Sequence, residues 1–100
     1  MEININTQGN ETVAALNGRL DTLAAQEVAE QFETLAQKAG GTIVLDCSQL
    51  EYISSSGLRL FLTLRKAAAT KGGKVIIRDI NYDVRSVFMI TGFLNLFEIQ

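Results

Sequence analysis

The sequence predicts an α/β domain with a mixed sheet of about four strands, a parallel core and an antiparallel N-terminal strand, flanked by about three helices. Three observations support this fold class. The chain starts with alternating apolar and polar residues, as a half-buried strand does. Two later runs, residues 43–45 and 75–77, are apolar without interruption, which is typical of strands buried on both faces. Helical segments join these strands, and such crossovers produce a parallel core. With 100 residues, the chain is expected to form one domain, residues 1–100.

The first two predicted elements are strands that form a hairpin. "MEININT" (residues 1–7) places Ile3, Ile5 and Thr7 on one face and polar residues on the other. The residues "QGNE" are typical of a turn, and "TVAALNGRL" (residues 12–20) is predicted to be the second strand. Gly18 is expected to end this pair.

The next segment, "DTLAAQEVAEQFETLAQKAGG", is predicted to be an amphipathic helix. Its apolar residues recur at spacings of three and four, which places them on one face: Ala25, Val28, Ala29, Phe32, Leu35, Ala36 and Ala39. Asp21 or Thr22 is expected to cap its start, because an oxygen acceptor there meets unpaired N–H groups. Gly40 and Gly41 are expected to end it.

The second half of the chain is predicted to alternate between strands and helices. "TIVLDCSQLEYI" (residues 42–53) is a strand, and a helix from about Ser56 to Thr70 follows and ends before two glycines. "KVIIRDI" (residues 74–80) is the next strand. A short helix is expected from a cap at Asp83 to about Thr91, with Gly92 just past its end. A last extended piece is expected at "LFEI" (residues 96–99).

Composition excludes several classes of function. The net charge is −2 and no basic cluster is present, so a nucleic-acid partner is not expected. There is no histidine, so a Ser-His-Asp or Cys-His site cannot be built within the chain, and the ligands for a zinc site are poor. We therefore expect no enzyme activity, no metal and no cofactor. The apolar runs are too short for membrane insertion and no secretory signal is visible, which predicts a cytoplasmic protein. Cys47 is expected to be a buried thiol.

Three consecutive serines, Ser54, Ser55 and Ser56, lie between the first predicted buried strand (residues 42–53) and the helix that follows it. The carboxyl end of a strand is where ligands collect in open α/β sheets, and a helix N-terminus favours a phosphate. Gly57 removes a side chain where a bulky partner would approach. The turn is therefore a candidate for a bound or covalent phosphate. The alternative is that one serine only caps the helix.

The helix after the serines has an unusual surface pattern. One narrow polar stripe contains Arg59, Thr63, Lys66 and Thr70. The residues opposite the stripe, which should be core, are Phe61, Leu64 and Ala68. The apolar residues beside the stripe are Leu58, Leu62 and Ala69. An exposed apolar flank next to the serine turn would indicate a protein partner, unless neighbouring elements cover it.

These segments resemble a known family. "GRLDTLAA", "IVLDCSQLEYISSSGLRLFLTLRKAAATKGGKVIIRDI" and "VRSVFMITGFLNLFEI" are similar, in order and spacing, to the bacterial anti-sigma factor antagonists of the STAS domain family. The most specific part is the apolar strand with its Asp and the S-[ST]-G-L turn that opens a helix. The resemblance covers nearly the whole chain and implies a STAS-like sheet.

The resemblance also implies a regulatory site. Ser55 matches the serine that accepts a phosphate from an anti-sigma factor serine kinase, and Ser56 matches the second hydroxyl. Asp21 matches a family aspartate near that site. Taken together with the glycine of the turn and the surface pattern of the following helix, the predicted partner-binding residues are Asp21, Ser54, Ser56, Gly57, Leu58, Arg59 and Leu62. The unphosphorylated form would bind the kinase and so release a sigma factor, and a PP2C-type phosphatase would reset the phosphorylated form.

The sequence departs from the family pattern at one place. Many phosphorylated members have Asp immediately before the acceptor, whereas this chain has Ser54, which is also an alternative acceptor. Other proteins of this fold are non-phosphorylated subunits of an ATPase-driven lipid-transport complex or parts of stress-signalling assemblies. That role remains the alternative prediction.

Overall fold

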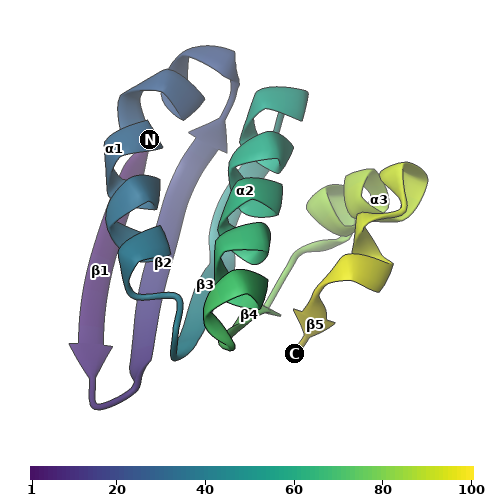
Figure 1. Ribbon diagram of the computed structural model, residues 1–100. Helices are drawn as coiled ribbons and strands as arrows, with labels where there is room; N and C mark the ends of the chain where they lie inside the picture. The colour runs from purple at the N-terminus through teal and green to yellow at the C-terminus, as the bar shows by residue number, and fades with distance from the viewer.

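A computed structural model describes all residues, 1–100, as one sheet with helices packed on it (Figure 1). The sheet has five strands in the order β1-β2-β3-β4-β5. The strands are β1 (Glu2–Gln8), β2 (Glu11–Leu20), β3 (Thr42–Ile53), β4 (Lys74–Arg78) and β5 (Glu98–Ile99). The helices are α1 (Thr22–Gln37), α2 (Ser55–Lys71) and α3 (Tyr82–Thr91), followed by a short 3-10 turn, η1 (Phe93–Leu96).

The pairing of the strands confirms the predicted mixed sheet. β1 and β2 form the antiparallel hairpin, and the pairs β2–β3, β3–β4 and β4–β5 are parallel. The prediction of about four strands is close, because the fifth strand pairs over only two positions within the piece expected to be extended. The expectation that Gly18 ends the hairpin is confirmed, because the last β1–β2 pair joins Glu2 and Asn17 and only the pairing with β3 goes further. β2 continues to Leu20 through a register shift after Gly18, whose φ of +113° suits a glycine.

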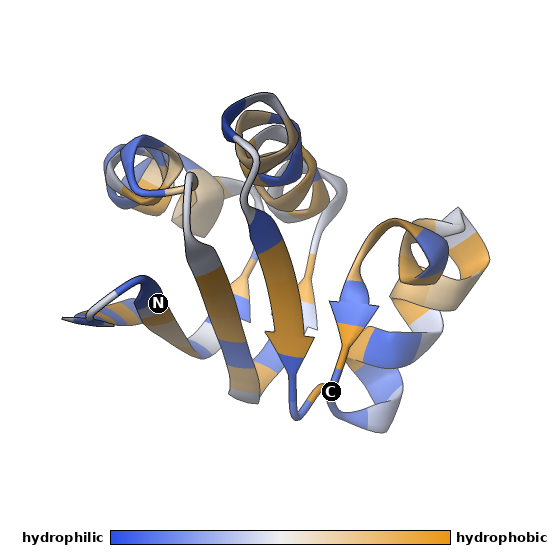
Figure 2. Cartoon of the chain, turned by 60° about the horizontal axis from the view of Figure 1, so that its bottom comes forward, coloured by the Kyte–Doolittle hydropathy of each residue, from blue (hydrophilic) through white to orange (hydrophobic).

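The core lies between the sheet and the three helices. Its aromatic centre is Phe61 of α2, which packs on Phe32 of α1, Phe88 of α3 and Phe97, with ring centroids 5.8 to 6.4 Å apart. The predicted core positions Phe61, Leu64 and Ala68 are buried. Figure 2 shows α1 and α2 together above the sheet and α3 beside them. The middle strands are hydrophobic along most of their length, as the apolar runs predicted.

Several predicted element ends differ from the structure by one to three residues. α1 ends at Gln37 with Lys38 as its C-cap, before the two glycines that were expected to end it. α2 begins at Ser55 and ends at Lys71, where Gly72 adopts the left-handed conformation. The predicted cap of α3 at Asp83 is wrong, because the Asn81 side chain accepts the N–H of Val84. No helix is both long and apolar enough to cross a membrane.

Candidate functional site

The serine turn lies at the edge of the sheet where β2 and β3 end and where α1 and α2 begin (Figure 1). The backbone N–H of Ser54 donates to the carbonyl of Leu20 at 2.9 Å, which ties the turn to the end of β2. Asp21 follows Leu20 directly and caps α1. The structure thus brings Asp21 and the three serines to one edge of the sheet, as the resemblance implied.

Ser54 is the N-cap of α2. Its Oγ accepts the backbone N–H of Gly57 at 3.2 Å, and its φ and ψ are extended, as a cap requires. The capping interpretation is therefore correct for one of the three serines. Asp and Ser cap helices about equally well, so Ser54 preserves the local structure that an aspartate would form here. What the chain lacks at this position is the negative charge.

Ser55 and Ser56 occupy the first two positions of α2. Ser55 is exposed, and its hydroxyl forms no hydrogen bond within the chain, whereas Ser56 is half-buried and faces α1. The first N–H groups of a helix have no intrahelical acceptor. Ser54 satisfies that of Gly57, and those of Ser55 and Ser56 stay available to an anion beside the Ser55 hydroxyl.

Asp21 caps the N-terminus of α1 at this edge of the sheet. Its Oδ1 accepts the N–H of Ala24 at 2.8 Å, and its backbone carbonyl accepts that of Ala25 at 2.9 Å. Of the two predicted caps, Asp21 is the one used. Its side chain remains exposed, so the second carboxylate oxygen faces solvent.

Gly57 and Leu58 differ from the expectation. A Cβ at Gly57 would lie 2.8 Å from Leu20 Cγ and 2.9 Å from Ile53 Cγ1. The glycine therefore makes room for the chain's own core rather than for a bulky partner. Leu58 is only 5% exposed and belongs to the core, so its expected place on an exposed flank is wrong.

The outward face of α2 carries the remaining predicted residues. Arg59 is exposed and forms no hydrogen bond or ion pair within the chain, whose one ion pair joins Lys74 and Glu98. Leu62 is half-buried but does not pack against the core cluster. Ser55, Arg59 and Leu62 follow the spacings of four and three that place residues on one helix face. The exposed strip on this face of α2 is therefore narrower than predicted, because Leu58 is buried and does not belong to it.

Sequence reasoning missed a groove that starts at this turn. A hollow of about 330 Å³ lies between α1 and α2, and its lining includes Thr22, Ala29, Ser56 and Leu60. The available signal was the series of alanines on α1, whose small side chains leave the space between the helices unfilled. Reasoning from single helices could not show it, because the groove needs both of them.

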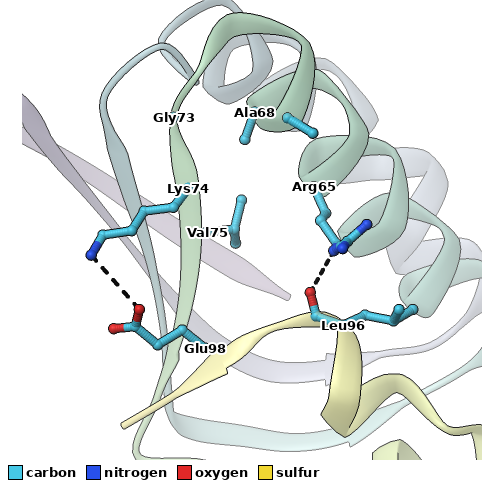
Figure 3. Close-up of a pocket in the computed structure, with 8 residues that line it drawn as sticks. Arg65, Ala68, Gly73, Lys74, Val75, Leu96 and Glu98 are labelled. Atoms are coloured by element: carbon cyan, nitrogen blue, oxygen red, sulfur yellow. Dashed lines mark hydrogen bonds and ion pairs between the residues drawn. The ribbon is translucent and has the colours of Figure 1, made fainter.

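A second hollow, of about 220 Å³, lies away from the serine turn between the second half of α2, β4 and β5 (Figure 3). Its polar side chains are used by the fold. Arg65 donates its Nε to the carbonyl of Leu96, and Lys74 Nζ lies 3.7 Å from Glu98 Oε1. These contacts hold the C-terminal segment against α2 and β4.

The side chains of this protein do not form a cluster suited to a metal ion. Cys47 is fully buried, and burial, with a smaller contribution from the charge of Asp46, raises its pKa from 9.0 to about 12. The thiol is therefore protonated and unreactive at neutral pH. The serine turn remains the place where solvent-accessible hydroxyls meet unpaired N–H groups.

Comparison with known proteins agrees with this fold. The STAS domain model matches residues 2–100. BtrV of Bordetella bronchiseptica, named as a candidate anti-sigma factor antagonist, is 32% identical over 87 residues, covering 87% of this chain and 75% of the relative. The anti-sigma-B factor antagonist of Bacillus subtilis is 26% identical over 102 residues, covering 100% and 93%.

The solved structures of SpoIIAA show the same fold. The unphosphorylated form of this anti-sigma factor antagonist has a TM-score of 0.75 at 20% identity, covering 99% of this chain and 87% of SpoIIAA. The phosphorylated form, described as a Bacillus cell fate determinant, has a TM-score of 0.74 at 21% identity, covering 99% and 91%.

The fold is that of a small α/β domain, and the relatives found by sequence are named as anti-sigma factor antagonists. The chain belongs to the STAS domain family, whose pattern extends from the first strand to the last.

Proposed function

We propose that this protein is an anti-sigma factor antagonist that binds an anti-sigma factor with serine kinase activity, and that phosphorylation of Ser55 switches this binding off. The proposal rests on family membership and on relatives named for the same role. The single observation that carries the switch is the exposed Ser55 hydroxyl at the first position of α2.

Ser55 is a better acceptor than its neighbours. The hydroxyl of Ser54 is engaged in the N-cap and half-buried, and that of Ser56 faces the groove between the helices. A kinase needs its target hydroxyl in contact with its own active site, which favours the exposed Ser55. Ser54 remains the alternative acceptor, one residue away.

The fold should accept a phosphate on Ser55. The phosphate adds about −1.5 to −2 charges at neutral pH, and the N-terminus of a helix stabilises negative charge. Arg59 lies four residues further along the same helix and has no other partner, so its guanidinium can pair with the phosphate. A partner surface that docks over Ser55 would instead have to desolvate this charge. The modification should therefore change binding and leave folding intact.

The proposed partner surface consists of the serine turn with Asp21 and the outward strip of α2 that contains Arg59 and Leu62. Gly57 and Leu58 support this surface from beneath, because both are buried. A PP2C-type phosphatase would remove the phosphate. The protein would act in the cytoplasm, where sigma factors and ATP are found.

A static binding role is the second candidate. Ser54 stands where many phosphorylated relatives have an aspartate, so the negative charge beside the acceptor is missing. A non-phosphorylated subunit of a lipid-transport ATPase or of a stress-signalling assembly would need the same surface without the switch.

The test uses the anti-sigma factor kinase of the source bacterium, purified, with ATP and the intact protein. Mass spectrometry should map one phosphate to Ser55. Ser55→Ala should stop the modification and still bind the kinase, and Ser55→Asp should fold normally and bind weakly. Full modification of Ser55→Ala on Ser54 would move the acceptor by one residue. If neither serine is modified and Ser55→Asp binds as the wild type does, the static role is correct.

A further inference from the structure

The groove between α1 and α2 extends beyond the serine turn. Its upper hollow, beside Thr22 and Ser56, measures about 330 Å³. A lower hollow of about 160 Å³ follows and shares Ala29, Leu60 and Thr63 with the upper one. Along α1 the upper hollow spans residues 22–29 and the lower one spans residues 29–36. Along α1 the midpoints of the two linings are seven residues apart, which is about 10 Å at 1.5 Å per residue. Along α2 the linings overlap, since the upper hollow spans residues 56–63 and the lower one spans residues 60–64.

α3 has an apolar face that nothing in the chain covers. Tyr82 is 81% exposed, Met89 is 61% exposed and Ile90 is 85% exposed, while Val84 and Phe88 on the other side of the helix are buried. A helix that is apolar on both sides is usually covered on both sides. α3 lies to the side of the α1 and α2 pair, so its outer face cannot reach the chain's own groove (Figure 1).

We infer that the outer face of α3 docks into the α1–α2 groove of a second copy of this chain. The spacing fits the α1 wall of the groove, because Tyr82 and Met89 are seven residues apart, the same separation as the two hollows have along α1. Tyr82 would enter the upper hollow, and Met89 with Ile90 the lower one. α3 then runs parallel to α1 and α2, as a third helix in the groove between two.

The charges fit the same orientation. Arg59 is the one charged residue that lines the upper hollow, on the α2 wall, and Glu33 is the one that lines the lower hollow, on the α1 wall. Neither has an ion-pair partner within the chain. Viewed down the axis of α3, the exposed face is centred near Ser86. Asp83 lies about 60° to one side of Ser86 and Arg85 about 100° to the other side, so the two charges flank this face. With α3 parallel to the groove, Asp83 turns toward Arg59 and Arg85 toward Glu33.

This contact joins two different surfaces, so it is heterologous. After two copies pair, one of them still has a free groove and the other a free α3, so further copies can add in a head-to-tail chain or the chain can close into a ring. The inference needs no kinase and no phosphate, although the groove shares Arg59 with the proposed partner surface.

The test measures the mass of the purified, unmodified protein by sedimentation velocity from micromolar to millimolar concentration. The average mass should rise above that of the monomer as concentration increases. Ala29→Leu fills the groove at a residue of α1 that lines both hollows, and Ile90→Glu places a charge on the α3 face. Each variant alone should weaken self-association at least about tenfold, or about 1.4 kcal/mol. Ala69→Leu is the matched control outside the groove and should associate as the wild type does.

Mixing distinguishes this contact from other pairings. The Ala29→Leu variant keeps its α3 face and the Ile90→Glu variant keeps its groove, so an equimolar mixture should form one-to-one pairs and no larger species. Glu33→Arg should weaken association, and Arg85→Glu in the other copy should restore it, whereas Glu27→Arg on the far side of α1 should have no effect. A wild type that stays monomeric at millimolar concentration overturns the inference. So does an Ala29→Leu variant that self-associates fully, because α3 would then pair with α3.

Discussion

Replacing Ser54 tests whether the cap and the switch are separate functions of neighbouring serines. In the structure Ser54 Oγ accepts the N–H of Gly57 at 3.2 Å, and the loss of such a cap costs about 1 kcal/mol. For a domain of this size, 1 kcal/mol shifts the melting temperature by roughly 4–8 °C. Ser54→Ala should therefore melt about 4–8 °C below the wild type. Ser54→Asp keeps the acceptor and adds a charge at the helix N-terminus worth about 0.3–1 kcal/mol, so it should melt at or above the wild-type temperature.

The assay is thermal unfolding followed by far-UV circular dichroism, with Ser55→Ala as the matched control. Ser55 is exposed and its hydroxyl forms no hydrogen bond, so its removal should change stability by less than about 0.5 kcal/mol. Ser54→Asp should also still be phosphorylated on Ser55, since it restores the aspartate that many relatives have. If Ser54→Ala melts as the wild type does, or if Ser55→Ala loses more stability than Ser54→Ala, the assignment of the cap is wrong.

Three further predictions concern residues around the turn. Gly57→Ala should lower the free energy of unfolding in urea by about 1–2 kcal/mol. The new Cβ would lie 2.8–2.9 Å from atoms of Leu20 and Ile53, and this overpacking outweighs the gain in helix propensity. A more stable variant would contradict this reasoning. Leu62→Glu should weaken kinase binding but change the free energy of unfolding by less than about 0.5 kcal/mol, since Leu62 does not pack on the core. A large loss of stability would show that Leu62 does not belong to the partner surface. Cys47 should resist a thiol reagent at pH 8 until the protein unfolds. Because its folded pKa is raised to about 12 from 9.0, its contribution to stability is complete below pH 9 and declines as the pH rises toward 12, a decline that Cys47→Ala should lack.

The sequence predicted the type and order of the strands and helices better than the contacts that set where each one begins and ends. The uninterrupted apolar residues 43–45 and 75–77 marked the two central strands because burial on both faces removes any alternation. The two-residue β5 was foreseen only as an extended piece, since such a short pairing has no pattern of its own. At the start of α3, both Asn81 and Asp83 are good caps, and the choice depends on a contact distant in sequence. The Asn81 side chain also donates to the carbonyl of Leu50 at 2.7 Å, which fixes the helix start against β3.

For the site, the sequence identified the serine turn but not which of its residues cap the helix, pack in the core or lie exposed. Helical spacing placed Leu58 beside the polar stripe, but it could not show how far the core reaches around α2. Gly57 was interpreted as space for a partner because nothing local reveals Leu20, which is 37 residues away in the sequence yet in contact. The groove and the exposed face of α3 required the relative positions of three helices, which no single segment encodes.

The central claim is that a phosphate on Ser55 acts on binding rather than on folding. The most direct measurement is the affinity of the anti-sigma factor kinase for the unmodified protein and for the protein phosphorylated on Ser55, by titration calorimetry, with the melting temperature of each form measured alongside. We expect the phosphorylated form to bind about 5- to 150-fold more weakly, the range for a coupling of about 1–3 kcal/mol, and to melt close to the unmodified protein. Equal affinities with a phosphate mapped to Ser55 would contradict it, and so would weak binding accompanied by a large loss of stability.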